Sequence, residues 1–104
     1  MIPKPLRPFI MRLLQATGDN ELKWNEGADD AYFATRKNAD LHIRYFFDSD
    51  TGEGGYTFRI LRGDGDAFFT VSNNEDDYYL MRDLYSAISV NAAGGEQIVS
   101  GLFD

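Results

Sequence analysis

Cysteine is absent from the 104-residue sequence, and histidine occurs only once, at position 42. The lack of cysteine excludes disulfides, thiol nucleophiles and cysteine-ligated metals, and it is compatible with a reducing compartment. A serine–histidine–acid site would have to use His42, which falls in the middle of an expected strand with Leu61 as its neighbour. A phosphate-binding glycine loop is also missing. We therefore expect no catalytic residues, no cofactor and no enzymatic activity.

Long apolar runs are missing as well. No stretch approaches the roughly 18–20 residues that a membrane span requires. Residues 1–15 mix basic and apolar side chains, as a signal peptide does, but Pro8 and Arg12 interrupt the apolar stretch and no small-residue cleavage site follows. We expect a mature cytoplasmic protein without a membrane segment.

Basic residues are scarce in the C-terminal part of the chain. The net charge is −7, and residues 1–63 carry nine basic and nine acidic side chains. Residues 64–104 carry one basic side chain and eight acidic ones. Such an excess repels nucleic acid at long range and favours solubility. Nucleic acid is therefore not the expected partner.

The residues that are present predict two helices. Apolar side chains recur at one-turn spacing from Pro8, a residue suited to a first helical turn, to Gly18, which predicts a helix over residues 8–17. A second helix is expected after residues 72–77, with Asn73 or Asn74 as its N-cap. Its end is expected at the glycine pair 94–95.

Four runs between these helices predict strands: 31–37, 41–47, 56–62 and 67–72. The order is α-β-β-β-β-α. A chain of this length with 14% aromatic residues can form one domain around its own core. We expect a single α+β domain over residues 1–104, with a four-stranded antiparallel meander and both helices on one face.

The segment Arg62 to Asp66 allows three interpretations. Arg62-Gly63-Asp64 is a tripeptide known from cell adhesion, and Asp64 and Asp66 can begin a metal loop. Asp64-Gly65 between two apolar runs is, however, among the strongest hairpin signals. A two-residue turn at Asp64-Gly65 would place Leu61 opposite Phe68. We expect the turn, and neither adhesion nor a metal.

The expected registers divide the sheet into two faces. Pairing Phe47 with Tyr56 places Arg44 directly opposite Arg59, and a three-residue turn after the first strand directs Phe33 toward the helices. No acidic residue is expected beside the two arginines. The face without helices then carries the following side chains: Tyr32, Arg36, His42, Arg44, Phe46, Thr57, Arg59, Leu61 and Phe68.

This open face has two interpretations. The arginine stems can simply cover Phe46, Leu61 and Phe68 while their charged ends stay hydrated. Alternatively, these three residues form the apolar centre of an interface, and the arginines Arg44 and Arg59 receive an anionic or acidic partner.

Acidic side chains are expected to gather at one end of the sheet, because the 48–55 loop and the 73–77 junction share that end. Six carboxylates can hold a hard cation such as Ca²⁺. The loop fails the calcium pattern, however, since its fifth position is Gly52, and the helix dipole explains the acids before the second helix. We expect no dedicated metal site at this end, whose acids are Asp48, Asp50, Glu53, Glu75, Asp76 and Asp77.

Trp24 follows a short helix, "AYFATRKNADLHIRY" and "YTFRILRGDG" supply strands, and "LMRDLYSAI" supplies a helix containing Leu-Tyr. Over roughly residues 10–90 this pattern resembles a widespread group of small bacterial and phage-associated single-domain proteins of unknown function. The resemblance implies the same order of elements and a non-catalytic module. It supplies no functional residues.

The sequence therefore predicts a non-catalytic protein-interaction module, of the adaptor, immunity or inhibitor kind, that binds a partner protein or itself through the open face. One alternative is single-stranded nucleic-acid binding, with Tyr32, Phe46 and Phe68 as stacking platforms. In the other alternative, the acidic residues 64–104 mimic nucleic acid and occupy a basic protein. Neutralising Asp76 and Asp77 would then abolish activity.

Overall fold

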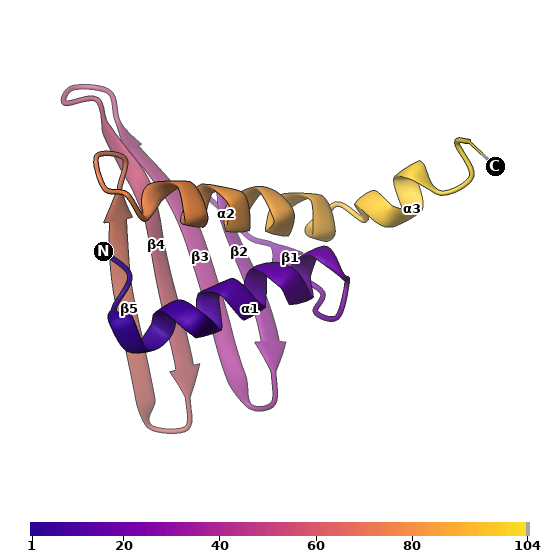
Figure 1. The fold of residues 1–104 in the computed structure, drawn as a ribbon, viewed down its shortest axis with the longest axis horizontal. Coiled ribbons are helices and arrows are strands. Elements are labelled where there is room, and N and C mark those ends of the chain that lie inside the picture. Colours follow the sequence, from indigo (N-terminus) through magenta and orange to yellow (C-terminus); the bar gives the residue numbers. More distant parts are fainter. Residues whose placement is uncertain (104) are drawn as a thin grey trace.

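Both long helices cover the same face of one antiparallel sheet, as Figure 1 shows. The computed structural model describes residues 1–103. The predicted α+β class, antiparallel meander and terminal helices are confirmed, but the sheet has five strands in the order β1-β2-β3-β4-β5. The elements are η1 (Lys4–Leu6), α1 (Arg7–Gly18), β1 (Asn25–Glu26), β2 (Ala31–Arg36), β3 (Ala39–Asp48), β4 (Glu53–Arg62), β5 (Gly65–Ser72), α2 (Tyr78–Ala92) and α3 (Gly95–Val99).

The two long helices form where the apolar spacing predicts them. Pro8 lies in the first turn of α1, where its missing N–H removes no helical hydrogen bond. Asp77, and neither Asn73 nor Asn74, precedes the first turn of α2, and it makes no side-chain cap. Gly94, with a φ of 73°, ends α2 as expected, because glycine adopts the left-handed conformation without steric cost. The short helix α3 then projects away from the sheet (Figure 1).

The turn between β4 and β5 is formed by Gly63-Asp64, and the prediction of Asp64-Gly65 is wrong. Arg62 pairs with Gly65, and Gly63 has a φ of 57° at the first central position. Glycine at that position is typical of a type II′ hairpin turn. The register moves by two residues, so each side chain keeps its face but changes its partner.

The β3–β4 register is also two residues away from the predicted one. Tyr45 pairs with Tyr56, and Arg44 therefore lies opposite Thr57 and not opposite Arg59. The expected pair of directly opposed arginines does not form.

The turn between β2 and β3 changes the faces of β2. Lys37 and Asn38 both have positive φ, of 48° and 66°, so the turn has two residues and not three. Phe33 consequently pairs with His42, and every side chain of β2 points to the face opposite to the predicted one. Phe33 lies on the open face, and Tyr32 and Arg36 lie on the face that the helices cover.

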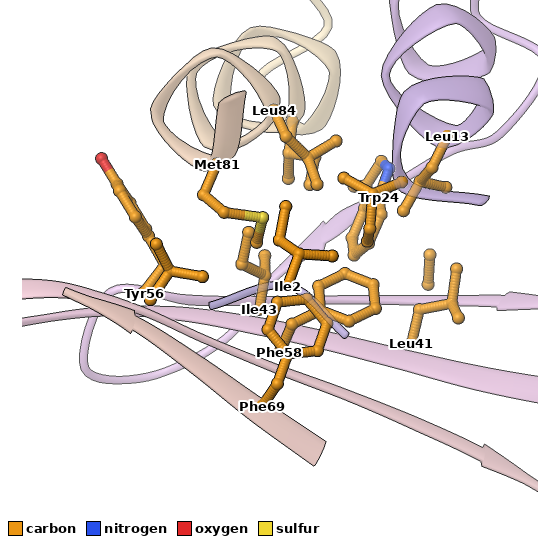
Figure 2. Close-up of a cluster of buried hydrophobic side chains, with 14 of the residues drawn as sticks. Ile2, Leu13, Trp24, Leu41, Ile43, Tyr56, Phe58, Phe69, Met81 and Leu84 are labelled. Carbon is orange, nitrogen blue, oxygen red and sulfur yellow. The ribbon is translucent and has the colours of Figure 1, made fainter. Parts of the chain in front are cut away.

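The core lies between the helices and the sheet. Figure 2 shows Met81 and Leu84 of α2 directed toward Ile43, Phe58 and their neighbours in the sheet. Trp24, immediately before β1, is fully buried and donates from Nε1 to Thr17 Oγ1 at 3.1 Å.

One polar side chain ties three segments of the core together. Asn91 of α2 accepts a hydrogen bond from the Trp24 backbone N–H at 2.8 Å and donates to the Leu22 carbonyl at 2.8 Å. It also donates to the Thr17 carbonyl at 3.2 Å. Buried polar groups are costly unless they are paired, so this contact makes the docking of α2 specific.

Candidate binding surface on the open sheet face

The strand registers arrange the open face in rows that run across the strands. The central row is Phe33, His42, Arg59 and Phe68. The Arg44 row, toward the β3–β4 hairpin, is Ala31, Arg44, Thr57 and Thr70. The Asp40 row, on the other side, is Thr35, Asp40, Leu61 and Asp66. Phe46 lies opposite Gly55, one row beyond Arg44.

Apolar side chains on this face reach solvent. Phe68 is 61% exposed, Phe33 44% and Leu61 39%, and Phe46 is half-buried. They belong to four strands, and Leu61 lies diagonally beside Phe68, whereas His42 and Arg59 separate Phe33 from Phe68. Several large apolar groups exposed on one face of a folded domain are typical of interaction surfaces.

Arg59 is held by a carboxylate of its own chain. Its Nε and Nη2 atoms donate to Asp66 Oδ1 and Oδ2 at 2.9 and 2.6 Å. This hydrogen-bonded pair holds the pKa of the Asp66 carboxyl below its usual range. The expectation that no acid lies beside the arginines is wrong, because the turn at Gly63-Asp64 brings Asp66 next to Leu61 on the same face.

Arg44 and Asp40 are the other two charges of these rows. No ion pair involves Arg44 within residues 1–103, and Asp40 accepts one hydrogen bond from Thr35 Oγ1 at 3.0 Å. They lie on the same strand, two residues to either side of His42. The face therefore presents one arginine and one aspartate that are free to meet outside groups.

His42 lies at the centre of the face. Its ring centroid is 4.8 Å from that of Phe33, and Arg59, not the predicted Leu61, is its neighbour across the strand. Burial lowers the pKa of the imidazole, and the nearby Arg44 and Arg59 lower it further. The ring is therefore uncharged at neutral pH. Beside it is a hollow of about 450 Å³ lined in part by Phe33, Asp40 and Leu61.

Two of the predicted surface residues lie elsewhere. Tyr32 contacts Tyr85 of α2, with ring centroids 5.4 Å apart, and Arg36 Nη1 donates to the Glu21 carbonyl at 3.0 Å. Phe33, which the sequence predicts to face the helices, lies on the open face. The dipeptide Lys37-Asn38 was the available signal, since asparagine favours the left-handed conformation that a type I′ turn requires.

A tyrosine cluster beneath α2 was also not anticipated. Neighbouring rings are 5.2 to 6.2 Å apart, and the Tyr85 hydroxyl donates to the Asp30 carbonyl at 3.0 Å. Burial raises the pKa of Tyr56 and raises that of Tyr85 to about 12, so both stay protonated at neutral pH. We assign this cluster to packing between α2 and the sheet; its members are Tyr32, Tyr45, Tyr56, Tyr78 and Tyr85.

At the acidic end, two carboxylates hold the N-terminal segment. Glu75 contacts the amino group of Met1 at 2.5 Å, and Asp77 pairs with Arg7 and accepts the Ile2 N–H at 2.9 Å. These contacts lower the pKa of both carboxyls, mainly through the hydrogen bond from the Met1 amino group and that from Arg7.

The other acidic residues at this end accept hydrogen bonds in or near the β3–β4 loop or are exposed to solvent. Asp48 accepts the Asp50 N–H at 2.9 Å, and Glu53 accepts a hydrogen bond from Ser72 at 3.3 Å. Asp76 is exposed. Within the described residues, 1–103, no three acidic or histidine side chains are placed to hold a metal ion.

A second hollow, of about 670 Å³, lies between the C-terminal half of α2, the end of α1 and α3. Small and apolar side chains such as Ala87, Val90 and Val99 line much of it. Its one charged lining residue, Glu96, is bonded to Asn20 at 2.7 Å. The open face, with its exposed aromatic rings and free charges, offers more chemistry for recognition.

No helix within residues 1–103 combines the length and the apolar character that crossing a bilayer requires. Comparison of the chain with protein-family models, with curated proteins and with solved structures found no match in any of the three. The resemblance to small bacterial and phage-associated proteins therefore stays a prediction.

Proposed function

We propose that the protein is a non-catalytic interaction module that binds a protein surface through its open sheet face. The observation that carries this proposal is the division of the sheet: both long helices lie on one face, and the other presents Phe33, Leu61 and Phe68 to solvent. The cytoplasmic location expected from the sequence is part of the proposal.

The electrostatics of the face favour burial against a protein. His42 is neutral, and Arg59 is already bonded to Asp66, so covering them leaves no isolated charge. Arg44 and Asp40 remain as one free cation and one free anion among exposed apolar side chains, and arginine beside apolar groups is typical of protein interfaces. A partner surface with apolar side chains and a carboxylate fits this arrangement.

The nucleic-acid alternative loses support from the same geometry. Tyr32 lies beneath α2 and cannot act as a stacking platform, although Phe33 takes a place on the face. The rows described above, all within residues 1–103, carry two arginines and two aspartates, and of these arginines only Arg44 is free for phosphate. A protein is the better candidate, because strong single-strand binding requires a positively charged groove.

The alternative in which acidic residues mimic nucleic acid also loses support, because few of the acids before α2 are free. Asp77 and Glu75 are bonded to the N-terminal segment and Ser72, which leaves Asp76 as the one acid of the 75–77 run without a recorded contact within residues 1–103. Neutralising Asp77 would therefore test folding as much as binding.

The test is capture from a cell lysate with the immobilised protein. We compare wild type with the Arg44→Glu/Phe68→Gln variant, and with Arg82→Glu/Met11→Gln as a matched control on the helices. Proteins are identified by mass spectrometry and nucleic acid is assayed in the same eluates. We expect a protein that the first variant loses and the control retains. Equal capture by all three proteins, or the loss of nucleic acid alone, would overturn the proposal.

A further inference from the structure

We propose that the occupant of the open face is a second copy of this chain, packed face to face about a two-fold axis that follows the central row. The inference rests on the proposed function and names its partner. It follows from the order of charges along β3, where Asp40, His42 and Arg44 succeed one another on the open face.

A two-fold axis along the central row exchanges the rows on either side of it. Successive open-face residues of a strand are about 6.8 Å apart, so Arg44 and Asp40 lie equally far from His42 in opposite directions. The axis therefore brings Arg44 of each copy over Asp40 of the other. Both contacts form at once, as the symmetry of a two-fold dimer requires.

The crossing of two packed sheets does not remove this match. Sheets that pack face to face cross at about 30°, which moves a residue about 7 Å from the axis by roughly 3.5 Å. An arginine side chain spans such a displacement. Phe33 and Phe68, at the ends of the central row, lie about 7 Å from its midpoint and move by a similar amount, which a phenylalanine ring also spans.

The side chains of the central row can pack against the same row of the second copy. Phe33 and Phe68 would lie on apolar rings, and His42 is uncharged. Arg59 would face Arg59 of the second copy, but each guanidinium carries its own Asp66 at 2.6 Å. Thr70 in the Arg44 row would lie over Asp66 of the second copy, where its hydroxyl can donate.

Net charge also favours this surface for self-association. Two chains of charge −7 repel each other, and most of their acidic side chains lie in the loops and at the ends of the strands. The central, Arg44 and Asp40 rows instead carry two arginines and two aspartates, and so sum to zero. Approach through these rows adds no local excess of like charge.

The size of the face sets the expected strength. Four strands about 4.8 Å apart and four rows about 6.8 Å apart cover roughly 500 Å² in projection. That places the pair at the small end of specific interfaces, where weak and transient complexes are found, and we expect a Kd in the micromolar range. The dimer should be measured up to several hundred micromolar protein.

The test uses sedimentation equilibrium of the full chain with two charge reversals. Arg44→Asp places two aspartates together across the dimer, and Asp40→Arg places two arginines together, so each variant alone should dimerise at least tenfold more weakly than wild type. Their net charges change in opposite directions, which separates contact from overall repulsion. Arg82→Asp and Asp83→Arg on α2 are matched controls and should dimerise as wild type does.

Mixing provides the decisive measurement. In a one-to-one mixture of Arg44→Asp with Asp40→Arg, both contacts of the mixed dimer are opposite in charge, and dimerisation should return to within about threefold of wild type. The double variant Arg44→Asp/Asp40→Arg should recover in the same way. Recovery also shows that each single variant is folded.

Failure of this inference and failure of the proposed function give different results. A wild type that stays monomeric, or a mixture that does not recover, overturns the second copy as occupant. If lysate capture is still lost in Arg44→Glu/Phe68→Gln, the face binds another protein and the proposed function stands. If capture is unchanged as well, both are wrong.

Discussion

The two faces of the sheet carry similar aromatic side chains in opposite environments. Phe58 on the covered face is fully buried, whereas Phe68, which precedes the cross-strand partner of Phe58, is 61% exposed. On the covered face, apolar burial and the hydrogen bonds of Asn91 hold two helices. On the open face, phenylalanine side chains stay exposed beside the bonded pair Arg59–Asp66 and the free charges Arg44 and Asp40. Amino-acid content alone therefore does not distinguish a core from an interface; the turns that set side-chain direction do.

The largest test of this comparison is the pair of variants Phe58→Ala and Phe68→Ala. Phe58→Ala should lower the free energy of unfolding by about 3–5 kcal/mol, because it opens a cavity in a closed core. Phe68→Ala should change it by less than about 0.5 kcal/mol. Urea denaturation measures both values. Equal losses would mean that Phe68 is packed as a core residue in solution.

Removing the polar contact of the covered face should have the next largest effect. Asn91→Ala leaves the Trp24 N–H and the Leu22 carbonyl without their partner, and each unpaired buried group costs about 1–3 kcal/mol. We expect a loss of roughly 2–3 kcal/mol in urea denaturation. Asn74→Ala, at an exposed position, is the control and should be neutral. A neutral Asn91→Ala would show that water replaces the amide.

Acid should weaken the attachment of Ile2 to the covered face. The pKa of Asp77 is lowered in the folded state, mainly by Arg7, so its contribution is present above the unfolded pKa of about 4. That contribution is lost as the pH falls through the lowered pKa of the folded state.

Asp77→Asn should therefore be about 1–2 kcal/mol less stable than wild type at pH 7. The difference should shrink toward pH 2, as measured by thermal unfolding at a series of pH values. Asp76→Asn is the matched control. A difference that is independent of pH would contradict the ion pair with Arg7.

The smallest effect concerns the turn that assigns Tyr32 and Phe33 to their faces. Lys37 has a φ of 48°, a conformation that glycine adopts without cost. Lys37→Gly should stabilise the fold by up to about 1 kcal/mol in urea denaturation, and Lys37→Val should destabilise it. Stabilisation by Lys37→Val would indicate the three-residue turn and the opposite faces for β2.

Sequence reasoning located both long helices and four of the strands, because helical spacing and alternation depend on nearby residues. It assigned the faces of β3, β4 and β5 correctly although their registers differ from the predicted ones by two residues, since an even shift keeps each side chain on its face. It failed for β2, where the shift is odd.

Of the candidate surface, Arg44, Arg59, Phe46, Leu61 and Phe68 lie on the open face as predicted. The pairing of Arg59 with Asp66 could not be predicted, because it depends on which dipeptide forms the β4–β5 turn. The sequence Gly63-Asp64-Gly65 allows a turn at Gly63-Asp64 or at Asp64-Gly65, and only the first brings Asp66 opposite Leu61. The strand β1 is only two residues long, and the burial of Ile2 depends on contacts far along the chain, so local patterns carry no signal for either.

The hydrogen bond from the Ile2 N–H to Asp77 joins residues 75 positions apart, so it cannot form during synthesis until Asp77 has been added to the chain. A ribosome adding ~5–20 residues per second needs about 4–15 s to travel from one to the other. Throughout that interval the first residues have no place to dock, and α1 displays apolar side chains that will later be covered. The nascent chain is therefore open to chaperones until α2 begins to emerge, and residues 1–18 settle only after the segment around Asp77 has been made.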